Sequence, residues 1–146
     1  MVLGSELVIK TVEQIEADNV STTVQPKSGD LKTAYKLNRD NCKIDWTERL
    51  DTIYNKIRGL NPFPAAWCFL DNDEDEPLTV KLFAVEKKAE YHNLKAGHLL
   101  INKDHLEVAC KDGYVIIKEI QLPGKRKMDV KSLLNGFKFT ETAKLL

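Results

Sequence analysis

The sequence has few cysteines and histidines, and it lacks a long apolar run. Among its 146 residues are three cysteines and three histidines. Cys42, Cys68 and Cys110 are far apart and odd in number, which argues for a reducing compartment and against a disulfide framework. No apolar run approaches the roughly 20 residues that span a bilayer. The N-terminus carries acids, so it does not resemble a secretory signal, and we expect a cytoplasmic protein without a membrane partner.

The sequence also lacks the motifs of several enzyme classes. His92, His98 and His105 have no cysteine or carboxylate at metal-ligand spacing, so no metal site is expected. There is no glycine-rich phosphate loop at a strand–helix junction and no Gly-x-Ser-x-Gly nucleophile elbow. The acidic run from Asp71 to Glu76 lacks the central glycine of a calcium loop, so a solvated turn is expected there. No catalytic residue is therefore assigned.

The charges are balanced in number but not along the chain. The formal net charge is zero, from 22 basic and 22 acidic residues. Acids are in excess over residues 1–30 and 71–90, and bases are in excess over 31–70 and 91–146. A neutral protein still binds nucleic acid when its basic segments share one face. The 42% hydrophobic share is that of an ordinary folded domain with its own core.

Two helices and a linker are expected in the first half of the chain. Residues 5–17 carry an apolar stripe at helical spacing, with Ser5 as the N-cap. Residues 20–35 are rich in polar residues, lack a period and predict a linker. A second helix is expected to open at Asp45 and to end at Gly59, because Gly is the usual C-terminal cap.

The second half of the chain predicts short antiparallel strands with hairpin turns. The expected strands are 66–70, 78–85, 97–101, 106–110 and 114–122, followed by a short helix between Asp129 and Gly136 and a candidate last strand at 137–139. The fold class is mainly β with flanking helices, an OB-fold-like small antiparallel β-barrel preceded by a helix. A generic five-stranded sandwich fits the pattern nearly as well.

A basic turn is the sharpest candidate site. Lys125, Arg126 and Lys127 follow Gly124, and three adjacent cations are expected to project into solvent. Such a turn binds phosphates through its cations and backbone N–H groups, although a solvated turn with no ligand would have the same sequence. Weaker candidates for nucleic-acid contact are Arg58, at the end of the second helix, and Lys36 and Arg39, where the linker meets the barrel.

A proline-rich bend separates the second helix from the first strand. Pro62 and Pro64 flank Phe63 and fix the direction of the chain before Trp67, so these residues are expected to be structural. Trp46 and Trp67 are expected to pack together in the core. Stacking of an aromatic ring on a nucleobase is the alternative in a fold of this kind.

These motifs, taken in order, resemble the C-terminal part of methionyl-tRNA formyltransferases. The resemblance covers essentially the whole chain and is carried by Lys36-Leu37, Ile44-Asp45-Trp46, Ile57-Arg58, Asn61-Pro62-Phe63-Pro64-Ala65-Ala66-Trp67 and Gly124-Lys125-Arg126-Lys127-Met128, with Leu3-Gly4-Ser5-Glu6-Leu7 resembling the family's last catalytic-domain helix. It implies that residues 1–19 are the terminal helix of a catalytic domain, residues 20–35 a linker, and residues 36–146 an OB-fold-like tRNA-binding domain.

The resemblance also implies a function for the parent enzyme. Its N-terminal domain would transfer a formyl group from 10-formyltetrahydrofolate to the methionyl amine of initiator methionyl-tRNA, while the barrel binds and orients that tRNA. The full-length protein is expected to be a monomer, and this chain carries no catalytic residue and no cofactor of its own. One alternative is the structural C-terminal barrel of a formyltransferase that acts on folate or nucleotide sugars. Another is a free-standing protein that binds single strands through exposed aromatics.

Overall fold

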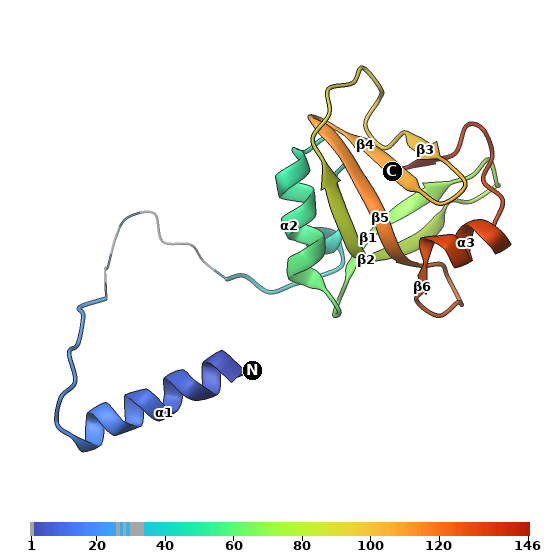
Figure 1. Cartoon of the computed structure of the whole chain (residues 1–146). Helices are drawn as coiled ribbons and strands as arrows, with labels where there is room; N and C mark the ends of the chain where they lie inside the picture. The colour runs from blue at the N-terminus through green and yellow to red at the C-terminus, as the bar shows by residue number, and fades with distance from the viewer. Residues whose placement is uncertain (1, 26, 28, 30–33) are drawn as a thin grey trace. The chain divides into compact units, whose positions relative to one another are not determined.

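The computed structural model of the chain describes residues 2–25, 27, 29 and 34–146, so the predicted linker lies partly outside the described residues (Figure 1). The chain divides into two compact units, Met1–Tyr35 and Lys36–Leu146. Among the residues described, no helix is both long enough and apolar enough to cross a membrane.

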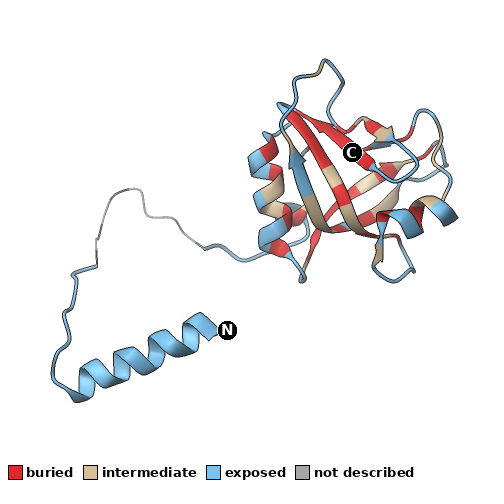
Figure 2. Ribbon diagram, in the orientation of Figure 1, coloured by how far each residue is buried: buried red, intermediate tan, exposed pale blue. Residues whose placement is uncertain are grey.

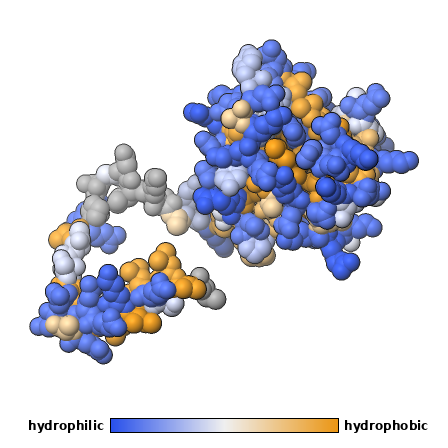
Figure 3. Space-filling view, in the orientation of Figure 1, coloured by the Kyte–Doolittle hydropathy of each residue, from blue (hydrophilic) through white to orange (hydrophobic). Residues whose placement is uncertain are grey.

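The first unit contains one helix, α1 (Val2–Glu16), which is exposed along its whole length (Figure 2). The predicted start at residue 5 is wrong, because Ser5 lies inside the helix and its hydroxyl donates to the carbonyl of Val2 at 2.8 Å. A hydroxyl that bonds back to its own helix cannot serve as the N-cap. Apolar side chains of α1 are visible as an orange area in Figure 3; the exposed ones are Val2, Leu3, Leu7, Val8, Ile9, Val12 and Ile15.

The second unit is a nearly closed barrel of short antiparallel strands with helices against it, as the sequence predicts. Its elements in chain order are the 3₁₀ turn η1 (Asp40–Cys42), α2 (Leu50–Leu60), β1 (Ala66–Asp71), β2 (Leu78–Lys88), β3 (Leu99–Ile101), β4 (Leu106–Cys110), β5 (Gly113–Gln121), β6 (Met128–Asp129), α3 (Val130–Gly136) and β7 (Lys144–Leu145). The strands lie in the order β3-β4-β5-β2-β1-β7, and β6 pairs with β5. Figure 1 shows α2 along one side of the barrel and α3 beside β6.

The barrel closes where its C-terminal segment lies between the two ends of the sheet. Leu146 and Phe69 exchange both backbone hydrogen bonds, at 2.8 and 3.1 Å, and the Leu145 N–H donates to the Gly97 carbonyl at 2.9 Å. Gly97 has φ +81, and a Cβ at this position would lie 2.0 Å from the Leu145 carbonyl oxygen. Only glycine fits here, because the backbones approach closely and the conformation is left-handed.

Alternation along β1 and β2 separates the core from an outer face. Ala66, Cys68 and Leu70 are buried on β1, opposite Val80 and Leu82 of β2, which are also buried. Burial raises the pKa of the Cys68 thiol to about 12, because a low-dielectric interior disfavours the thiolate. The alternate residues of the two strands therefore point outward.

The start and the end of α2 both differ from prediction. Asp45 accepts from the backbone N–H and the hydroxyl of Thr47, at 2.9 and 2.7 Å, so it closes a turn ahead of the helix. The helix begins at Leu50, whose N–H donates to Asp112 at 2.7 Å. Gly59 lies within the last turn and does not cap it; the chain leaves the helix at Asn61 in extended conformation.

The predicted last strand at residues 137–139 is also wrong. This segment is not a strand in the structure, and the final pairing with β1 is made by β7 instead. Buried Asn72 holds the segment by donating to the Lys138 carbonyl at 3.2 Å and accepting from the Thr140 N–H at 2.9 Å. These side-chain bonds satisfy backbone groups that a ladder would otherwise pair.

Candidate nucleic-acid interface

The basic turn is the loop of a tight hairpin between β5 and β6. Gly124 takes φ +68 at its tip, a conformation that suits glycine. The Lys125 N–H donates to the Leu122 carbonyl at 3.1 Å, and the Gln121 side-chain amide donates to the Lys125 carbonyl at 2.8 Å. These two hydrogen bonds fix the backbone of the turn.

The three cations of the turn are exposed as predicted, but they are not equivalent. The Lys127 ammonium lies 2.8 Å from the Glu119 carboxylate and 5.5 Å from the centre of the Phe83 ring. Among the described residues, Lys125 and Arg126 have no carboxylate within ion-pair distance. Lys125 and Arg126 are therefore the cations of the turn whose charge is not already neutralised by a neighbour.

A row of three side chains crosses β1, β2 and β5 and ends beside the basic turn. Trp67 of β1 is the direct partner of Lys81 on β2, and Lys81 is the direct partner of Gln121 on β5. Direct partners point to the same face of a sheet. Gln121 in turn holds Lys125, so the exposed ammonium group of Lys81 belongs to the same face as the basic turn.

A groove of about 530 Å³ lies beside Trp67, and both Trp67 and Lys81 line it. The lining is mostly apolar, and the residues that form it are Leu37, Asn38, Arg39, Cys42, Phe63, Pro64, Ala65, Trp67, Thr79 and Lys81. Of these described residues the two charged ones are both cations. The Phe63 ring is 88% exposed, so it does not pack into the core.

Arg39 is fixed at the groove by Trp67. Its guanidinium carbon lies 4.7 Å from the centre of the Trp67 ring, and its carbonyl accepts from the Trp67 indole N–H at 2.7 Å. Stacking of this kind orients the guanidinium while leaving its N–H groups free to donate. Trp67 is buried beneath Arg39, and both Trp67 and Trp46 belong to the core.

The other two candidates lie outside this groove. The Lys36 carbonyl accepts from the Asn41 side chain at 3.0 Å, and the Lys36 side chain is exposed where the barrel unit begins. Arg58 is exposed in the last turn of α2 and donates to Asn55 one turn earlier, at 3.2 Å. The groove residues Phe63 and Lys81 were not predicted as site residues. The sequence indicates only that Lys81 faces solvent, since Lys81 occupies a polar position of its strand. It does not indicate that Lys81 and Phe63 line the same groove.

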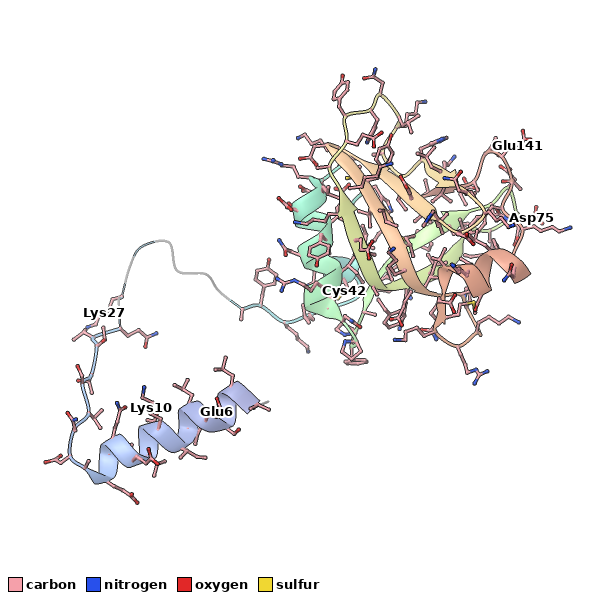
Figure 4. All side chains as sticks on the ribbon, viewed as in Figure 1. Glu6, Lys10, Lys27, Cys42, Asp75 and Glu141 are labelled. Carbon is pink, nitrogen blue, oxygen red and sulfur yellow. The ribbon has the colours of Figure 1, made fainter. Side chains whose placement is uncertain are left out.

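One acidic side chain close to the basic turn caps a helix. Asp129 accepts from the Ser132 N–H at 2.9 Å, and hydrogen bonds from Ser132 lower the pKa of its carboxyl. The acidic turn after β1 lies elsewhere, since Asp75 and the groove residue Cys42 are on opposite sides of the barrel unit (Figure 4). No group of three or more potential metal ligands occurs in the part of the chain that the structure describes.

Fold and site together define a small antiparallel β-barrel domain with an exposed basic face. The chain belongs to the family described as formyl transferase, C-terminal domain, whose sequence profile matches residues 36–138. This confirms the resemblance found in the sequence.

Relatives and solved structures agree with this assignment. The chain is 49% identical to the methionyl-tRNA formyltransferase of Flavobacterium johnsoniae and 40% identical to that of Bacteroides fragilis, in each case over 99% of this chain and 46% of the relative. The chain thus spans under half the length of these relatives. A crystal structure of a HypX variant from Aquifex aeolicus has the same fold, with a TM-score of 0.61 and 20% identity over 90% of this chain and 23% of HypX.

Proposed function

We propose that this chain is the tRNA-holding part of a methionyl-tRNA formyltransferase. In this proposal the barrel, residues 36–146, binds and orients initiator tRNA, while residues 1–19 end a catalytic domain and residues 20–35 link the two. That catalytic domain transfers the formyl group from 10-formyltetrahydrofolate to the methionyl amine. The whole protein acts as a cytoplasmic monomer. The relatives that carry this name support the proposal.

One observation carries the proposal for the barrel. Lys125 and Arg126 are exposed on a hairpin whose backbone is fixed, and they adjoin a face where Lys81 and Arg39 are also exposed. Cations with no protein carboxylate to neutralise them are available to phosphates, and each phosphate contact releases counterions. Such contacts position a nucleic acid and carry no sequence information. Reading of the tRNA acceptor end therefore belongs to the catalytic domain.

The test is a titration of labelled initiator tRNA with the 146-residue chain at 50 and 200 mM salt. Wild-type affinity should fall steeply with salt, and Arg126→Glu should weaken binding and make the salt slope smaller in magnitude by about one. Lys103→Glu is the matched control, since Lys103 is an exposed lysine of the β3–β4 turn. Equal losses in the two variants would show that the basic turn is not the contact.

The alternative, a formyltransferase that does not act on tRNA, predicts a different result in a binding experiment. A barrel that only frames a folate or nucleotide-sugar site should bind initiator tRNA no better than it binds an unrelated polyanion such as heparin. Wild-type affinities that are equal for the two ligands at 50 mM salt would favour that alternative.

A further inference from the structure

Phe63 is presented to solvent by a bend that is itself well fixed. Leu60 and Ala65, on either side of the bend, are buried, and the Ala65 N–H donates to the Leu60 carbonyl at 2.9 Å. The ring between them is 88% exposed and forms part of the groove wall. An exposed aromatic on a fixed bend offers a flat apolar surface without a cost in ordering the backbone.

Three aromatic rings of β1 and β2 have a cation against them. Arg39 stacks on Trp67 at 4.7 Å, Lys43 lies 4.9 Å from the centre of the Phe69 ring, and Lys127 lies over Phe83. Those three rings already have a cation against them. Within the part of the chain that the structure describes, no cation lies over the Phe63 ring, so its face is available to another planar group.

We propose that this groove holds one unpaired nucleotide of RNA, with the base stacked on Phe63 and the phosphate against Lys81 and Arg39. The inference rests on the proposed function, because it names the part of an RNA that the barrel contacts beyond its backbone. Charge complementarity argues for this occupant, since the charged lining residues Arg39 and Lys81 are both cations. A volume of about 530 Å³ falls within the range of about 300–1,000 Å³ typical of sites for small organic molecules.

Stacking explains the combination of residues better than a purely electrostatic contact does. A phosphate backbone needs only cations, and the basic turn already supplies them. Proteins that hold single-stranded nucleic acid add aromatic side chains, on which bases stack with little regard to sequence. The site should therefore accept any base and should depend on the base being present.

The test compares two RNA oligomers on the full 146-residue chain. One is single-stranded hexaadenylate, and the other is a hexamer of the same charge in which abasic ribose replaces every nucleoside. Phe63→Ala should weaken hexaadenylate binding about tenfold, by loss of one stacked base, and should leave the abasic hexamer unchanged. Phe63→Trp should retain binding. Tyr91→Ala is the matched control, because Tyr91 is 86% exposed and does not line the groove.

The outcomes separate this inference from the proposed function. Equal hexaadenylate affinities of wild type and Phe63→Ala would overturn the nucleotide site, and so would an equal loss for the abasic hexamer. If initiator tRNA still bound with steep salt dependence in that case, the tRNA-holding function would stand without it. If wild type bound neither tRNA nor hexaadenylate, both would fail. A urea unfolding curve for each variant shows that the fold is retained.

Discussion

Replacement of Gly97 by alanine should open the barrel at its closure. The new Cβ would lie 2.0 Å from the Leu145 carbonyl oxygen and 3.2 Å from its carbon. Both contacts are with backbone, which cannot move aside as a flexible side chain does. The strands must therefore separate at the point where Gly97 and Leu145 are hydrogen-bonded at 2.9 Å.

Three costs contribute to the loss of stability. A non-glycine residue in the left-handed region costs about 1–2 kcal/mol, and forcing an extra carbon into a packed site costs about 1–3 kcal/mol. Weakening the Leu145–Gly97 hydrogen bond costs about 0.5–1.5 kcal/mol more. We expect the free energy of unfolding to fall by about 2.5–6.5 kcal/mol, which is a large part of the total for a small domain.

Gly124→Ala separates the steric cost from the conformational one. Gly124 has φ +68 but nothing lies within 4 Å of a Cβ built there, so only the left-handed penalty of about 1–2 kcal/mol applies. The assay is urea unfolding followed by the fluorescence of Trp46 and Trp67, which are both buried in the barrel unit. If Gly97→Ala lost no more stability than Gly124→Ala, the close approach at the closure would not limit the fold.

Two further changes test α2. The hydrogen bond from the Leu50 N–H lowers the pKa of the Asp112 carboxyl. Ionised Asp112 therefore stabilises the fold at pH values above its unfolded pKa of about 3.9. This stabilisation is lost as the pH falls through the lower pKa that Asp112 has in the folded protein. The urea midpoint of wild type should fall more between pH 6 and pH 3 than that of Asp112→Asn, and parallel curves would contradict the capping role. Gly59→Ala should raise the free energy of unfolding by about 0.5–1 kcal/mol, because Gly59 is helical with open space around it; a loss measured in the same assay would show that Gly59 is needed at the helix end.

Local patterns in the sequence predicted those parts of the fold that depend on neighbouring residues. The strand 106–110 matches its prediction because turn residues on both sides of it, Asn102-Lys103-Asp104 and Asp112-Gly113, are local signals. Asp129 caps α3 as expected, since its partner Ser132 is three residues away. The cap of α2 was mispredicted because Asp112, which fills that role, is 62 residues from Leu50. No local pattern points to such a partner.

The candidate site likewise has one part that the sequence predicts and one part that it does not. Exposure of Lys125 and Arg126 follows from their charge and from Gly124, so it was predictable. The groove was not, because Lys81 and Phe63 meet only through the register of β1 with β2 and through the bend after α2. Cross-strand register is set by the pairing of distant segments, and a single sequence does not display it.

The position of β7 determines when this barrel can fold during synthesis. Leu70 pairs with Leu145, and Phe69 pairs with Leu146. Leu145 and Leu146 must therefore emerge from the ribosome before the hydrogen bonds that close the barrel can form. Until then β1 presents an unpaired edge, which is the kind of surface that neighbouring chains add strands to. Contacts this far apart in sequence also slow folding. During synthesis the domain therefore passes through a state in which the edge of β1 is unpaired, and this state lasts longer when translation is slower.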